Sequence, residues 1–129
     1  MHYVTDTHGL IWYLTGDKKL GKKALNLFEK ADEGGVTIIV PSIVLAEIIH
    51  VCEKKKAELK ISQVLNKIKS SLNYVVYNLD LNTLEKVMTL KNISEIHDKI
   101  ITATSLLTDS TLITKDEEIK NSCLVDTVW

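Results

Sequence analysis

The fold class of this chain is decided by residues 36–48, which read VTIIVPSIVLAEI. The run from Val36 to Val40 is apolar and mostly β-branched, which is typical of a strand buried on both faces. Pro41 and Ser42 then open a helix that is expected to continue to about Lys56. A buried strand that leads directly into a helix indicates an α/β protein with a parallel sheet.

The rest of the chain repeats this alternation of short apolar runs and amphipathic stretches. Further strands are predicted at residues 2–5, 74–79, 112–114 and 124–125. Further helices are predicted at residues 8–14, 22–31, 61–72, 81–90 and 94–107, with a helical turn at 116–120. Two helical faces are expected to point inward, one of Ala24, Leu27, Phe28 and Ala31 and one of Val64, Leu65, Ile68 and Leu72. The pattern predicts a three-layer α/β/α sandwich with a central parallel sheet, in a single domain over residues 1–129.

The composition is that of an ordinary globular protein, with 45% hydrophobic and 26% charged residues. Sixteen basic residues face seventeen acidic ones, so net charge alone does not indicate a nucleic-acid binder. Every basic residue other than histidine is a lysine, which predicts contacts to a nucleic-acid backbone rather than bidentate reading of bases. Cys52 and Cys123 lack metal-site spacing, and no signal peptide or membrane span is apparent, so a cytoplasmic protein is expected.

Four acidic residues are predicted to lie at one edge of the sheet. Asp6 directly follows the first strand, and Asp116 follows the strand at 112–114. Glu47 and Asp98 lie near the starts of two predicted helices. The helix of Glu47 directly follows the strand at 36–40. Ligands of open parallel sheets bind beyond the carboxyl ends of the strands, where the strand order reverses. We therefore expect these four side chains to surround one site.

Each acidic residue also has a simpler interpretation. Glu47 is the only charged residue in the apolar run 43–52, so its helix is expected to be buried, and His50 is an alternative partner for its carboxylate. Asp98 is also explained by a helix dipole, and Asp6 and Asp116 by capping or turn formation. The convergence of all four favours a site, because capping does not explain Glu47.

A divalent cation makes such a cluster tolerable. Four neighbouring carboxylates repel one another, and a bound cation removes that conflict. Hard cations such as Mg²⁺ or Mn²⁺ take oxygen ligands, whereas the cysteine and histidine spacing does not suit zinc. A metal held in this way suits hydrolysis of phosphodiester bonds.

Four stretches resemble the PIN domain, and within it the VapC-type toxin ribonucleases of prokaryotic toxin–antitoxin pairs. They are Val4–His8 with Trp12 following, Ser42–Ile48, His97–Ala103 and Leu112–Asp116, in the family's order. The resemblance implies an endoribonuclease dependent on Mg²⁺ or Mn²⁺ that leaves a 5′-phosphate and a 3′-hydroxyl. It implies Asp6 and Asp98 as principal metal ligands, Glu47 and Asp116 as the acids that complete the pocket, and Thr114 as a hydroxyl that steadies them. RNA as substrate, a cognate antitoxin as partner and a homodimer are also implied.

The chain departs from the family pattern at two positions. Where related chains often have aspartate and arginine, this chain has Glu95 and Lys99. Glu95 keeps the charge with a longer side chain and is treated as an accessory residue. Lys99 lacks the planar fork of arginine, which puts any arginine-specific contact in doubt.

Other functions remain open from the sequence. A phosphotransfer domain of the haloacid-dehalogenase or receiver type would use Asp6 or Asp80, although the paired acids that such sites need are missing. A PIN-like interaction module without activity is the second alternative. His8 is interpreted as a capping or packing residue, and Trp12 and Tyr13 as core or dimer contacts rather than a base-stacking platform. The lysines at 18, 19, 22, 23 and 54–56 are interpreted as solvated surface.

Overall fold

A parallel sheet runs through the centre of the molecule in the order β3-β2-β1-β4-β5, as described by a computed structural model for residues 1–55 and 58–129. The strands are β1 (His2–Thr5), β2 (Thr37–Pro41), β3 (Tyr74–Tyr77), β4 (Thr111–Ile113) and β5 (Thr127–Val128). The helices are α1 (Thr7–Thr15), α2 (Lys22–Asp32), α3 (Ser42–Glu53), α4 (Ile61–Ser70), α5 (Leu81–Met88), α6 (Ile96–Leu107) and α7 (Glu117–Ser122).

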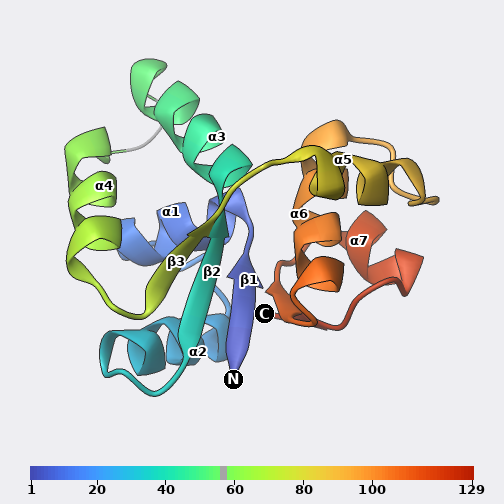
Figure 1. Ribbon diagram of the computed structural model, residues 1–129. Helices are drawn as coiled ribbons and strands as arrows, with labels where there is room; N and C mark the ends of the chain where they lie inside the picture. Colours follow the sequence, from blue (N-terminus) through green and yellow to red (C-terminus); the bar gives the residue numbers. More distant parts are fainter. Residues whose placement is uncertain (56–57) are drawn as a thin grey trace.

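Helices cover the sheet on both sides, as Figure 1 shows. In that view α1, α2 and α4 lie to the left of the strands, and α5, α6 and α7 lie to the right. Helix α6 contacts both β1 and β4, and α5 contacts α6. The predicted three-layer α/β/α sandwich with a parallel sheet is therefore confirmed.

The strand order reverses next to β1. From β1 the chain adds β2 and β3 on one side, and it later adds β4 and β5 on the other. The carboxyl ends of β1 and β4 therefore flank the position at which parallel sheets bind ligands. Thr5 pairs in register with Ile113, and the Asp6 amide donates to the Ile113 carbonyl at 3.2 Å. This register brings Asp6 next to the residues that follow β4.

The main hydrophobic core lies between the sheet and the helices on both of its sides. Its largest fully buried side chains include Phe28, Leu10, Ile38, Ile101 and Leu112. The predicted inner face of α2 is confirmed, with Ala24, Phe28 and Ala31 buried and Leu27 partly buried. Burial of these apolar side chains holds the strands at the spacing that the site requires.

Two predictions near the chain's short elements were wrong. The last strand is Thr127–Val128 instead of 124–125, because pairing with Leu112 and Ile113 of β4 selects the later residues. Leu124 and Val125 instead pack against the core as partly buried side chains. Helix α4 ends at Ser70, since Ser71 is extended, and Leu72 is therefore 95% exposed instead of facing inward. Leu65 in the same helix is also exposed.

The prediction that the helix of Glu47 is buried was also wrong. Within α3 only Val44 and Ile48 are buried, and Ile49 is 41% exposed. Figure 1 shows that the C-terminal half of α3 projects beyond the end of the sheet, where the strands do not cover it. The helix ends at Glu53, and Lys56 of the predicted range lies outside the described residues.

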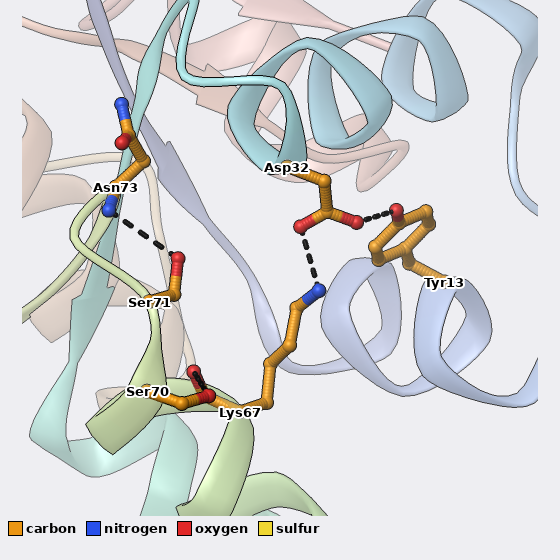
Figure 2. Close-up of polar contacts among 6 residues, drawn as sticks. All are labelled: Tyr13, Asp32, Lys67, Ser70, Ser71 and Asn73. Atoms are coloured by element: carbon orange, nitrogen blue, oxygen red, sulfur yellow. Dashed lines mark hydrogen bonds and ion pairs between the residues drawn. The ribbon is translucent and has the colours of Figure 1, made fainter.

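One polar cluster joins three helices on the opposite side of the core from α6. The Tyr13 hydroxyl of α1 donates to Asp32 at the end of α2, and the Lys67 ammonium of α4 donates to the same carboxylate at 2.6 Å (Figure 2). Asp32 and Lys67 are each about one-third exposed. The cluster therefore connects α1, α2 and α4 through one carboxylate that water partly screens.

Replacing Asp32 with alanine is expected to lower the free energy of unfolding by about 1 kcal/mol, because two donors lose their charged acceptor. Burial raises the pKa of Asp32, but the hydrogen bonds from Lys67 and Tyr13 outweigh it and lower the pKa overall. The difference should therefore be present at neutral pH and disappear as the pH falls below ~4. Urea unfolding of Asp32→Ala beside Glu33→Ala measures it, and equal losses in both variants would contradict the assignment.

Candidate active site

A cavity of about 350 Å³ lies at the carboxyl ends of β1 and β4. The structure places all four predicted acidic residues on its wall, and they come from four separate parts of the chain. Its lining residues are Asp6, Thr7, His8, Glu47, Glu95, Asp98, Ile101, Lys115 and Asp116. The cavity therefore gathers carboxylates at the position where the reversal of strand order creates a crevice.

Asp6 is held by two hydrogen bonds from different elements. It caps the N-terminus of α1, with Oδ1 accepting from the Gly9 amide at 2.7 Å. Its Oδ2 accepts from the Thr114 hydroxyl at 2.6 Å. Burial raises the pKa of Asp6, and these two hydrogen bonds offset only part of that rise. Asp6 is a capping residue, as one interpretation predicted, and it also lines the cavity.

Thr114 connects Asp6 to Asp116. Its hydroxyl donates to Asp6 and accepts from the Asp116 amide at 3.1 Å. Asp116 in turn caps α7, with Oδ1 accepting from the Ile119 amide at 2.9 Å. One buried hydroxyl therefore sets the spacing between the first and last acidic residues of the site.

Glu47 is held by Thr7, the first residue of α1. Its Oε1 accepts from the Thr7 hydroxyl at 2.6 Å. His50, which the sequence suggested as an alternative partner, is exposed, and no hydrogen bond joins it to Glu47 within the described residues. The half-buried carboxylate of Glu47 is therefore directed toward α1 and the cavity.

Asp98 is the acid with the least support from neighbouring donors. Glu95, and not Asp98, caps α6, because Glu95 Oε2 accepts from the Asp98 amide at 2.9 Å. Burial, followed by the nearby charges of Asp116, Glu95, Glu47 and Asp6 in that order, raises the pKa of Asp98 to about 6. The site therefore disfavours a negative charge on Asp98 unless a cation is present.

The sequence comparison identifies the family of this chain. Residues 3–123 match the PIN domain. The chain belongs to the PIN domain family. PIN domains are generally nucleases, which supports a hydrolase that acts on nucleic acid. No curated protein matches the sequence significantly.

Solved structures show the same PIN fold at low sequence identity. VapBC2 from Rickettsia felis, bound to a DNA fragment from its promoter, has a TM-score of 0.74 at 20% identity and covers 99% of this chain and 98% of that chain. A toxin–antitoxin complex from Klebsiella pneumoniae has a TM-score of 0.69 at 18% identity, covering 98% and 96%. FitAcB from Neisseria gonorrhoeae has a TM-score of 0.66 at 14% identity, also covering 98% and 96%.

The donor set of this PIN domain suits a hard divalent cation. All four acids supply oxygen atoms. Burial, and then repulsion by the neighbouring acids, raises the pKa of Asp98. Among the described residues, no group of three acidic, histidine or cysteine side chains lies close enough together to hold a metal ion without rearrangement. Mg²⁺ commonly binds one or two protein carboxylates and completes its shell with water and phosphate, so a cavity with spaced carboxylates fits it.

Three residues at the site were not singled out by the sequence. Thr7 donates a hydrogen bond to Glu47. Lys115, which lies between Thr114 and Asp116 in the sequence, lines the cavity. Gly9 lets its amide reach Asp6, because a Cβ there would lie 2.9 Å from Asp6 Oδ1. A glycine inside a helix destabilises it by about 1 kcal/mol relative to alanine. A glycine at such a position in the sequence therefore indicates that the backbone lies close to a neighbouring group.

The phosphotransfer alternatives receive no support from the geometry. A haloacid-dehalogenase-type site needs a second aspartate two residues after the nucleophile, and that position after Asp6 holds His8. Asp80 caps α5 after the edge strand β3, whereas a receiver-type acceptor would end a central strand. Its Oδ1 accepts from both the amide and the hydroxyl of Thr83.

Among the helices that the structure describes, none is long and apolar enough to span a membrane.

Proposed function

We propose that this PIN domain is an endoribonuclease dependent on Mg²⁺ or Mn²⁺, and that it is the toxin of a type II toxin–antitoxin pair. The observation that carries the proposal is the convergence of four carboxylates, distant in sequence, on one cavity. It acts as a single domain over residues 1–129, in the cytoplasm where its RNA substrate is found. The toxin role is supported by structural similarity to VapBC2 and to the Klebsiella pneumoniae toxin–antitoxin complex.

Asp6 and Asp98 are the principal ligands of the cation in this proposal, and Glu47 and Asp116 complete the pocket. The Thr114 hydroxyl holds Asp6, and Glu95 caps α6, the helix that carries Asp98, by accepting a hydrogen bond from the Asp98 amide. When bound, a divalent cation neutralises phosphate charge, activates water and stabilises the leaving oxygen.

The reaction is an in-line displacement at phosphorus. The oxygen of a water molecule bonds to the phosphorus as the bond to the 3′-oxygen breaks. The attacking water gives up a proton and the departing 3′-oxygen takes one from solvent, which leaves a 5′-phosphate and a 3′-hydroxyl. Glu47 Oε1 is held by Thr7, so Glu47 Oε2 is the oxygen that accepts a proton from the attacking water.

Cleavage of structured RNAs by the purified protein is the test of this proposal. Activity should require Mg²⁺ or Mn²⁺, stop in EDTA, and fall by at least ~100-fold in Asp6→Asn, because that change removes a charged ligand and keeps the helix cap. Asp109→Asn is the matched control, since Asp109 is exposed in the turn after α6 and has a positive φ that asparagine tolerates. Equal cleavage by the wild type and Asp6→Asn, or cleavage in EDTA, would refute the proposal.

The protein is also proposed to form a homodimer and to bind a cognate antitoxin. Helix α5 presents an apolar stripe of Leu81, Leu84 and Met88 at helical spacing, and Leu81 and Met88 are 76% and 85% exposed. Exposed apolar stripes of this kind are typical of protein interfaces. Helix α5 itself packs on α6 and lies away from the labelled strands (Figure 1).

Replacing Leu84 and Met88 together with glutamate is expected to shift the protein from dimer to monomer at micromolar concentration, because charges would be buried in the interface. Sedimentation velocity measures the change, and Leu72→Glu controls for a charge at another exposed leucine. A wild type that is monomeric throughout the micromolar range would overturn the dimer, and a double variant that stays dimeric would exclude this face.

A further inference from the structure

Trp12 lies beside the acidic cavity with two lysines over its indole ring. The ammonium of Lys115 is 4.7 Å from the ring centroid, and that of Lys19 is 5.5 Å away. The imidazole of His8 lies at 5.3 Å with its plane tilted by 43°. The indole is half-buried against the core, and Trp129 meets it edge-on at 5.8 Å. Tyr13, by contrast, stacks on Phe28 within the core.

Two further cavities flank the acidic one and share residues with it. A cavity of about 580 Å³ is lined in part by Trp12, Lys19 and His8, and His8 also lines the acidic cavity. A second cavity of about 350 Å³ is lined in part by Lys23 and Lys120, and Lys115 belongs to both it and the acidic cavity. Each neighbouring cavity therefore shares one residue with the acidic cavity and adds lysines to its surroundings, together with Asp17 and Glu58 in the larger one and Glu117 in the smaller one.

The backbones of Lys19 and Lys115 are held in place. Lys19 is in a turn in which its amide donates to Asp17 Oδ1 at 2.9 Å and the Leu20 amide donates to the Asp17 carbonyl. Lys115 lies between Thr114, bonded to Asp6, and Asp116, which caps α7. Neither ammonium forms a salt bridge with a carboxylate in residues 1–55 and 58–129. Lys18, Lys19, Lys22 and Lys23 are exposed, as their interpretation as solvated surface predicted, and the ammonium of Lys19 also lies over the indole of Trp12.

A polyanionic substrate needs such a feature at this site. The acidic cavity repels phosphate, so binding energy must come from neighbouring cations. Lysine ammonium groups bind phosphates as point charges without reading sequence. A tilted pair of rings such as His8 and Trp12 offers a surface on which an unstacked base can rest, and only single-stranded nucleic acid presents such bases.

We propose that Trp12, Lys19 and Lys115 form a subsite that binds the nucleotide next to the scissile phosphodiester in single-stranded RNA. The two ammonium groups bind the flanking phosphate, and the His8 and Trp12 rings contact its base. The inference rests on the proposed nuclease function and assigns residues of this chain that hold the substrate beside the acidic cavity. It also makes the subsite tolerant of sequence.

Binding measured without a divalent cation tests the subsite separately from cleavage. The protein is prepared as Trp129→Phe, so that Trp12 is its only tryptophan, and is titrated in EDTA with a short single-stranded oligoribonucleotide and with its duplex. Fluorescence anisotropy of labelled RNA gives the affinity, and intrinsic fluorescence reports on Trp12. We expect Trp12 emission to be quenched by the single strand and the duplex to bind at least ~10-fold more weakly.

Lysine variants show which charges contact the phosphates. Lys19→Gln and Lys115→Gln should each weaken binding about fivefold at low salt and reduce the slope of log affinity against log salt by about 0.7. Lys69→Gln is the control, because Lys69 is exposed in α4 and lines none of the three cavities. Affinities and slopes equal to the control, unquenched Trp12, or equal binding of duplex and single strand would each overturn the subsite.

The nuclease proposal can fail independently of the subsite. If Asp6→Asn cleaves as well as the wild type while Lys19→Gln binds weakly, the subsite stands and the catalytic assignment falls. If Asp6→Asn is inactive while the lysine variants bind and cut like the wild type, the catalytic assignment stands and the subsite falls.

Discussion

Replacing Asp98 with asparagine is expected to lower RNA cleavage by at least ~100-fold and, in the absence of metal, to make the protein more stable. Activity falls because a principal charged ligand of the proposed cation is lost. Stability rises because burial, and then the like charges around the carboxylate, raise the pKa of Asp98 to about 6. A neutral amide of the same shape avoids that repulsion.

The stability difference should depend on pH in a defined direction. A carboxyl group whose pKa is higher in the folded protein than in the unfolded chain destabilises the fold as the pH rises. Below pH ~4 the group is protonated in both states, so the wild type and Asp98→Asn should differ little. Above about pH 7 the variant should be more stable by about 1 to 2 kcal/mol, after allowing for screening by water.

Urea unfolding in EDTA at several pH values measures this difference. Addition of Mg²⁺ at neutral pH should stabilise the wild type and have little effect on Asp98→Asn, because a ligand that binds the folded state stabilises it. Asp109→Asn serves again as the control, since its carboxylate is exposed. A variant that is less stable than the wild type at neutral pH would show that Asp98 is not electrostatically strained.

Replacing Thr114 with valine is expected to reduce cleavage by about 10- to 100-fold, because the lost hydroxyl orients two acids at once. Thr114 is buried, and its hydroxyl donates to Asp6 and accepts from the Asp116 amide. Valine has the same shape but leaves Asp6 Oδ2 without its donor. The pKa of Asp6, already raised by burial, should then rise further and weaken the binding of a cation.

Thr114→Ser separates the hydroxyl from the methyl group. Serine keeps the hydrogen bonds and loses only the methyl, so it should retain most of the activity and Mg²⁺ affinity. Cleavage rates as a function of Mg²⁺ concentration distinguish a loss of metal affinity from a loss of maximal rate. Equal activity in the valine and serine variants would show that the hydroxyl does not position the acids.

The fold and the metal-ligand candidates differ in how they follow from the sequence. The strand at 37–41 and the helix α3 after it were predicted because buried β-branched runs and helix starts are local signals. The final strand was misplaced because two-residue pairing depends on register with β4 and leaves almost no local pattern. The inward face of α4 was overextended because the helix ends two residues earlier than its apolar spacing indicates.

The sequence by itself determined the class of fold, the family and four acids that a parallel sheet would direct to one edge, because periodicity and position after a strand are properties of the local chain. Only the tertiary structure decided which groups hold those acids. The hydrogen bonds from Thr7 to Glu47 and from Thr114 to Asp6 join different elements, and local sequence patterns do not record such contacts. Local patterns also do not show that Glu95, and not Asp98, caps α6. The same holds for the lysines over Trp12, since residues 12, 19 and 115 approach one another only after β4 is placed beside β1.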